Sequence, residues 1–194
     1  VNDVFASQNR AVTSNDYEAL VYRMHPRFGS VKRAKIVRDQ DSFKRNLNLY
    51  IVSEDADRNL TTSSPLLKNN IKTWLNQYRM INDTIDILDP KIINIKINFS
   101  AVTDTSTDKT EALNVAITEI QDLFTEKLDI GQPIYITKIY DVLNNLDEIV
   151  DVTNVEIINQ NGGLYSDETL NLKQYISADG RILYSPENVI YELK

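Results

Sequence analysis

Apolar and polar residues alternate most regularly at residues 91–99. Isoleucine or phenylalanine occupies every second position from Ile93 to Phe99, and asparagine or lysine, including Asn94, fills the positions between them. A period of two places the apolar set on one face of a strand and the polar set in water or at a lightly packed interface. The pattern therefore predicts a strand with one buried face.

A helical pattern follows this strand, at residues 106–128. Apolar residues recur there at the three- and four-residue spacing of one helix face: Leu113, Ala116, Ile117, Ile120, Leu123, Phe124 and Leu128. A strand followed by such a helix is typical of a sheet with a helix packed on it. Further along, 134–136 is expected to be extended, 138–146 helical and 149–158 a strand.

The first half of the chain predicts a second set of such elements. Thr13 and Asp16 have the spacing of a capping box, so a helix should begin there and end near His25, before Pro26. Residues 31–38 and 47–52 are rich in β-branched and aromatic residues and could pair as a hairpin.

Ser64 and Pro65 predict the start of another helix, since serine caps a helix and proline suits its first position. Its expected apolar stripe would place Trp74 in the core between the helix and the sheet. The stripe of this helix consists of Leu67, Ile71, Trp74, Leu75 and Tyr78. A short extended segment is expected after the helix, at 84–88.

Asp89-Pro90 is the expected boundary between two small α/β units. The predicted organisation is an extended arm at 1–12, a first unit at 13–89, a second unit at 90–160, and a carboxy-terminal β-hairpin-like arm at 161–194. The expected fold class is α/β (α+β), with a helix packed on a sheet in each unit.

Composition narrows the class of protein. The chain has 194 residues, 42% of them hydrophobic, and no cysteine, which excludes disulfides and thiolate zinc sites. It has no apolar run of the roughly 20 residues that a membrane span needs, and no signal-peptide pattern. These features predict a soluble globular protein. Because Val1 is not a methionine, the chain is expected to be either processed or the last part of a longer one, and we favour the second.

Charge is unevenly distributed. Residues 1–58 hold ten Lys and Arg against eight Asp and Glu, whereas 59–194 hold eleven against twenty. A net charge of −7 argues against nucleic-acid binding. Alternation along 31–38 puts Arg33 and Lys35 together on one strand face. A solvated face is the ordinary interpretation, and a protein interface at these two residues is the functional hypothesis.

Candidate catalytic and metal-binding residues lack partners in the sequence. His25 is the only histidine, and a role at a helix terminus is favoured over general-base catalysis. Asp83, Asp86 and Asp89 are spaced by three, but they fall in an extended segment and before a proline, which favours turn and cap roles. We therefore expect no enzymatic activity, no cofactor, no metal and no small-molecule substrate.

A segment similar to a calcium loop and a glycine pair are both incomplete as binding motifs. The segment from Asp104 to Glu111 begins like a calcium loop, but Lys109 and Val115 stand where an EF-hand needs glycine and glutamate. Asp108 as a helix cap is the better interpretation. Gly162-Gly163 lacks the strand and helix of a dinucleotide-binding motif.

The order of elements nevertheless resembles a known family. The opening Arg10-Ala11-Val12-Thr13-Ser14-Asn15-Asp16-Tyr17-Glu18 is similar to the "RAVT-x-x-DYE" entrance of baseplate-J-like proteins, which are wedge subunits of contractile phage tails and related injection machines. Pro90 to Ile97 resembles the family's "P-x-x-x-x-I-x-I" strand, and 131–134 and 152–155 resemble its "G-x-x-I" and "V-x-x-V" segments. The resemblance covers roughly residues 9–160.

Within that family the chain is most similar to the carboxy-terminal region of the large baseplate wedge proteins of myovirus tails. The resemblance implies a structural virion protein, assembled in the host cytoplasm, whose copies pair and join other wedge proteins in a ring around the tail hub. It implies neither a membrane nor a nucleic-acid partner. The alternative is a cellular adaptor or peptide-binding module that uses an exposed sheet edge.

Overall fold

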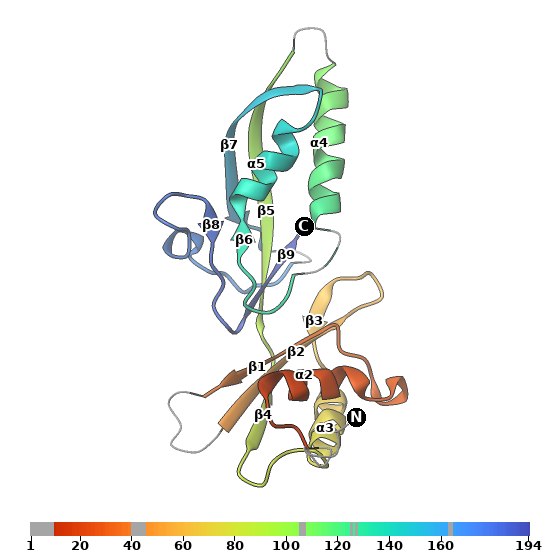
Figure 1. Ribbon diagram of the computed structural model, residues 1–194. Helices are drawn as coiled ribbons and strands as arrows, with labels where there is room; N and C mark the ends of the chain where they lie inside the picture. Colours follow the sequence, from red (N-terminus) through yellow and green to blue (C-terminus); the bar gives the residue numbers. More distant parts are fainter. Residues whose placement is uncertain (1–9, 40–45, 105–107, 125, 127, 163–164) are drawn as a thin grey trace, which may run out of the picture. The chain divides into compact units, whose positions relative to one another are not determined.

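The chain divides into two units, residues 1–90 and 91–194 (Figure 1). The computed structural model describes residues 10–39, 46–104, 108–124, 126, 128–162 and 165–194. Each unit has a sheet, helices and a hydrophobic core of its own, so the fold class is mixed α/β, as the sequence predicted.

The sheet of the first unit is built around β2 (Asn46–Glu54). β1 (Arg33–Arg38) pairs with it antiparallel, which confirms the predicted hairpin partners. On the opposite side of β2, β3 (Leu60–Thr62) pairs antiparallel with the end of the strand, at 52–54. β4 (Thr84–Leu88) pairs parallel with its beginning, at 46–50. The parallel pair arises because the connection from β3 to β4 passes through a helix.

Local capping signals set the helices of the first unit. α2 (Ser14–Arg23) carries the predicted capping box of Thr13 and Asp16, and α3 (Pro65–Leu75) is capped by Ser64, whose Oγ accepts from the amide of Leu67 at 3.2 Å. A short 3-10 helix, η1 (Pro26–Phe28), follows α2. The core that these elements share is formed by Tyr17, Leu20, Leu49, Ile51, Leu67, Ile71, Leu75 and Ile85, among others.

Trp74 corrects one expectation about this core. It is only half-buried, and its indole N–H donates to the carbonyl of Leu20 on α2 at 2.9 Å. Its ring also lies edge-on to Tyr78, with 4.9 Å between centroids. Trp74 therefore packs at the edge of this core, where α3 meets α2, and is not fully enclosed in it.

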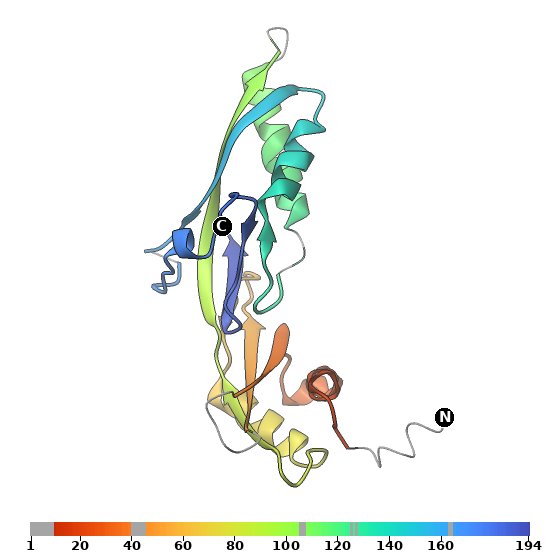
Figure 2. The same ribbon diagram turned by 60° about the vertical axis from the view of Figure 1, so that its left-hand side comes forward.

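The long strand β5 (Lys91–Thr103) organises the second unit, with β7 (Ile149–Asn159) antiparallel on one side and β9 (Val189–Leu193) parallel on the other. Figures 1 and 2 show α4 (Lys109–Leu123) and α5 (Ile136–Asn144) on one face of the β5–β7 ribbon. A two-stranded sheet of β6 (Ile134–Tyr135) and β8 (Ile182–Leu183) and a 3-10 helix, η2 (Leu172–Gln174), complete it.

Residues 161–194 do not form the expected hairpin-like arm. β8 pairs with β6 and β9 pairs with β5, so both strands belong to the second unit. The turn at Asp179-Gly180 is present, and Gly180 has φ +71°, a conformation that glycine adopts without strain. The turn chemistry was readable from the sequence, but the partners of β8 lie 47 and 49 residues earlier in the chain and those of β9 lie 98 residues earlier.

Asn94 also departs from its expected place. It is buried, with its Nδ2 donating to Glu192 Oε2 at 3.0 Å and its Oδ1 accepting from the amide of Ser166 at 2.7 Å. Glu192 also forms an ion pair with Lys194, at 3.2 Å. The polar face of β5 is covered here because Glu192 of β9 and the segment around Ser166 lie beside Asn94.

α4 is shorter than predicted and turned about its axis. The buried residues are Ala112, Ala116 and Ile120, whereas Leu113 and Ile117 are 49% and 40% exposed. Small alanine side chains let the helix approach the sheet closely. The apolar flank beside them is left at the surface. No helix within the described ranges is long and apolar enough to cross a membrane.

Candidate interaction surfaces

The basic strand face predicted from Arg33 and Lys35 lies on β1. Both residues are half-buried, and the alternate residue Ile36 is buried in the core of the first unit. Arg33 Nη1 donates to the carbonyl of Lys32 at 3.0 Å, and Lys32 itself pairs with Glu54 at 2.9 Å. The side chain of Arg33 is thus partly held against its own strand, and it is less exposed than the sequence suggested.

Side chains of α2 cover the outer edge of β1. The amide of Ala34 donates to the hydroxyl of Tyr22 at 2.8 Å, and the amide of Ile36 donates to Glu18 Oε1 at 2.8 Å. These bonds occupy donors that would otherwise receive another strand. The β1 edge is therefore closed to strand addition by its own helix, and any contact there must use side chains.

His25 has a structural role in the first unit. Its Nδ1 accepts from the amide of Arg27 at 3.2 Å and so caps η1, as expected for a residue at a helix terminus.

The three spaced aspartates separate rather than converge. Asp83 accepts from the hydroxyl of Tyr17 in the core, Asp86 accepts from Asn46 Nδ2 at 3.0 Å, and Asp89 pairs with Lys68. Asp89 meets a cation, and Asp83 ends a turn, where its amide donates to the carbonyl of Met80 at 3.1 Å, so the turn role expected for these residues holds for Asp83. Over the described residues, no group of three or more His, Cys, Asp or Glu side chains is placed to hold a metal ion.

Asp108 caps α4 by accepting from the amide of Thr110 at 2.8 Å, which agrees with the preferred interpretation of that segment. Ser106 and Gly163, which belong to the calcium-like and glycine-rich motifs, lie outside the described residues.

The second unit carries an open strand edge that the sequence analysis missed. β9 pairs with β5 only from Lys91 to Ile95, and the amide of Lys194 adds one last bond to the carbonyl of Ile95 at 3.1 Å. On that side of β5, no described strand pairs with residues 97–103. On the other side β7 continues along β5 to its end, at Thr103.

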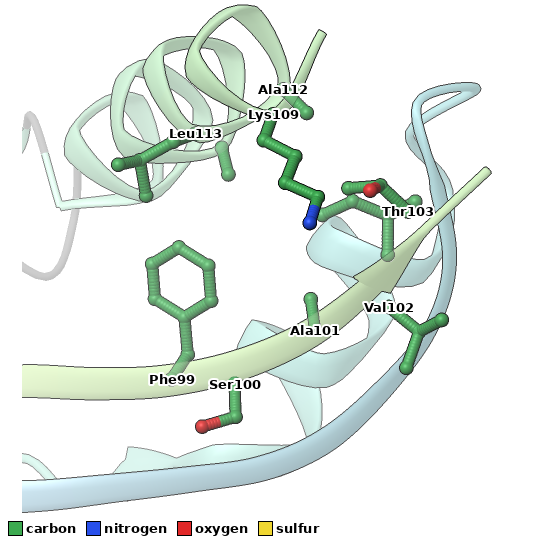
Figure 3. Close-up of a pocket in the computed structure, with 10 residues that line it drawn as sticks. Phe99, Ser100, Ala101, Val102, Thr103, Lys109, Ala112 and Leu113 are labelled. Carbon is green, nitrogen blue, oxygen red and sulfur yellow. The ribbon is translucent and has the colours of Figure 1, made fainter. Parts of the chain in front are cut away.

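Two adjoining hollows run along this open edge, between β5 and the apolar flank of α4. One has a volume of about 570 Å³ and the other about 380 Å³, and Phe99 lines both. Figure 3 shows Phe99 and Ala101 pointing toward α4, Ser100 and Val102 pointing away, and Lys109 extending from α4 toward Thr103. We call this surface the β5 groove. Its further lining residues include Lys96, Leu113, Ile117, Gln121, Phe124 and Lys194.

A sequence signal for the β5 groove was present in the helix pattern. The apolar stripe of α4 includes both the line of Ala112, Ala116 and Ile120 and the neighbouring line of Leu113 and Ile117. A stripe wider than one packed face indicates a helix with more apolar surface than its own unit covers. Periodicity alone does not tell which of the two lines is buried.

Comparisons with known proteins give similarities to solved structures alone. No protein-family model and no curated protein sequence matches the chain. Its fold is similar to that of a chain in a structure described as the cryo-EM structure of the anti-feeding prophage (AFP) baseplate, 6-fold symmetrised, with a TM-score of 0.64 and 12% sequence identity. The similarity covers 99% of this chain and 39% of the longer one, so this chain spans well under half the length of its structural relative.

Proposed function

We propose that the chain is a structural subunit of the baseplate of a contractile tail or injection machine, most similar in role to a baseplate wedge protein. The observation that carries the proposal is the similarity to a chain of the AFP baseplate, which extends over 99% of the residues and so takes in both units. The motifs of the first 160 residues resemble the baseplate-J-like family independently of the structure.

The expected partners are other baseplate proteins and a second copy of the chain. Closed two-fold contacts are the commonest form of self-association, and the family resemblance implies paired copies within a larger ring. We propose the baseplate of the assembled particle as the location of the protein. In this role the protein transmits force and holds subunits together, and it catalyses no reaction.

The basic face of β1 is the proposed contact of the first unit. Residues 1–90 hold thirteen Lys and Arg against eleven Asp and Glu, whereas residues 91–194 hold eight against seventeen. Arg33 and Lys35 could therefore steer the first unit of one copy toward an acidic surface on another copy or on a neighbouring wedge protein.

Charge reversal tests this contact. Arg33→Glu with Lys35→Glu should slow self-association of the purified chain and reduce its dependence on salt, because charges at a rim act mainly on the encounter rate. Arg23→Glu with Lys72→Glu is the matched control, since it makes the same charge change on exposed helix positions of the same unit. Equal rates for both double variants, at low and at high salt, would show that β1 is only a solvated face.

The proposed location can be tested with a tag. An epitope inserted in the exposed turn at 55–58, between β2 and β3, leaves both strands intact and can be labelled with gold on intact particles. Label at the baseplate end of the tail is the expected result. Label on the capsid or the tube, or particles that carry none, would contradict the proposal.

A further inference from the structure

The β5 groove has the properties of a site where a strand from another protein is added to a sheet. Backbone groups of β5 that face its open side can be assigned from the bonds that already exist there. The amide of Lys91 donates to Asn188 and the carbonyl of Ile95 accepts from Lys194, so the odd-numbered residues face the side of β9. By the alternation of a strand, the amide and carbonyl groups of Ile97 and Phe99 face the same side, beyond the end of β9.

The edge is regular enough to receive a partner. The register between β5 and β7 shifts after Ser100 and after Val102, but in both places the extra residue belongs to β7, at Thr153 and Val150. β5 therefore keeps its alternation to its end, as the side chains in Figure 3 show. Bulges that would turn an edge away from a partner are absent from this described strand.

The two faces of an added strand would meet different surroundings. On the α4 side it would contact Ile97 and Phe99 and lie beside the exposed Leu113 and Ile117, which favours apolar side chains. On the opposite face it would lie beside Lys96, which is exposed. A strand with alternating apolar and acidic residues satisfies both faces.

Charge strengthens the assignment of the partner. Residues 91–194 contain seventeen acidic and eight basic residues, yet the described residues that line the β5 groove include Lys96 and Lys109, together with Lys194, which pairs with Glu192, and no aspartate or glutamate. An acid-free basic groove in an acidic unit attracts an acidic segment.

We propose that the β5 groove binds an extended segment of another protein, with alternating apolar and acidic residues, as an added strand beside residues 97–103 of β5. The inference concerns the second unit alone and does not depend on the role in a baseplate. Main-chain bonds to Ile97 and Phe99 would supply affinity, and the apolar flank of α4 and the lysines would supply specificity.

The test is a titration of the isotope-labelled full chain with synthetic seven-residue peptides, followed by amide NMR. The probe is Val-Glu-Val-Glu-Ile-Asp-Val, and the comparison peptides replace its acidic residues by lysine or its central glutamate by proline. We expect shifts at the amides of Ile97 and Phe99 with a Kd below about 1 mM, and a Kd at least about tenfold higher for both comparison peptides.

Two protein variants separate the contributions. Lys96→Glu with Lys109→Glu should raise the Kd of the probe about tenfold at low salt and less at high salt, while Lys173→Glu with Arg181→Glu, the same charge change at exposed positions outside the groove, should leave it unchanged. Leu113→Gln with Ile117→Gln should weaken binding at every salt concentration, and both residues are exposed enough for the fold to tolerate the change.

Three results would overturn the inference. They are the absence of shifts at Ile97 and Phe99 up to about 1 mM peptide, equal binding of the acidic and the lysine peptide, and self-association of the chain that the Leu113 and Ile117 substitutions abolish. The last result would make a second copy the occupant of the β5 groove. The location of the tagged chain on intact particles tests the baseplate role in a separate experiment. A failure of the peptide titration therefore leaves the baseplate role standing, and the reverse also holds.

Discussion

Replacing Tyr17 with phenylalanine should destabilise the first unit while leaving its packing intact. The ring of Tyr17 is 1% exposed in the core, and its hydroxyl donates to Asp83 Oδ2 at 2.8 Å and accepts from the amide of Met80 at 3.2 Å. Phenylalanine keeps the ring and removes one oxygen. The loss therefore includes two hydrogen bonds that join α2 to the segment between α3 and β4.

The expected magnitude follows from the partners of that hydroxyl. Asp83 is 2% exposed, so its carboxylate loses a donor in a place where water cannot easily replace it. A bond to a charged acceptor contributes about 1.5–3 kcal/mol, and a buried amide that loses its acceptor costs about 1–3 kcal/mol before relaxation. Because the site can adjust in part, we expect Tyr17→Phe to lower the free energy of unfolding by about 2–4 kcal/mol.

The assay is urea unfolding followed by tryptophan fluorescence. Trp74 is the only tryptophan and lies in the first unit, so the signal reports this unit rather than the whole chain. Tyr22→Phe is the matched control: it removes a hydroxyl that accepts one bond from the amide of Ala34 on an exposed residue, and it should cost about 0.5–1.5 kcal/mol. If both variants lose the same stability, the Tyr17–Asp83 contact contributes no more than a surface bond and the reasoning is wrong.

The remaining predictions concern Trp74, Asp16 and Tyr191. Because Trp74 is half-buried, Trp74→Ala should cost about 2–4 kcal/mol and Trp74→Phe, which loses the bond to Leu20, about 1 kcal/mol, measured by far-UV circular dichroism. The amide of Thr13 holds the pKa of Asp16 below its usual range, so the stability contributed by this cap should persist above pH 4 and disappear as pH falls through the lowered pKa, and Asp16→Asn should flatten that dependence. Burial raises the pKa of Tyr191 to about 12, so the absorbance titration at 295 nm should contain a component near pH 12 that is missing in Tyr191→Phe; the contribution of Tyr191 to stability should be present below pH 10 and be lost as pH rises toward 12.

Each of these has a distinct contrary result. Equal unfolding midpoints for the wild type and Trp74→Ala would place the indole in solvent. An Asp16→Asn variant with an unchanged acid profile would remove the cap from the pH dependence. Absorbance titrations at 295 nm that are identical near pH 12 for the wild type and Tyr191→Phe would show that Tyr191 is open to water in the folded chain.

The sequence predicted those parts of the fold that depend on neighbours along the chain. Thr13 with Asp16 and Ser64 with Pro65 mark helix starts because a cap needs only residues two or three positions away. The hairpin of β1 and β2 was predictable for a related reason: its two runs of β-branched residues are adjacent in sequence.

Contacts between distant segments could not be predicted in this way. Asn94 resembles a solvent-facing residue until Glu192, 98 residues later, takes its place beside it in β9. The apolar stripe of α4 predicted a helix with an apolar face. That Ala116 is buried and Ile117 is exposed depends on how closely the helix approaches β5. The β5 groove arises from both effects, because it exists only where β9 ends and α4 continues.

A cryo-EM reconstruction of intact contractile particles that carry this chain is the most direct test of its proposed role. If the chain is a baseplate subunit, the map should contain the two units, with their separate sheets around β2 and β5, in symmetry-related copies within the baseplate. A baseplate map of comparable quality that is fully accounted for by other proteins, with this chain absent or located elsewhere in the particle, would contradict that role.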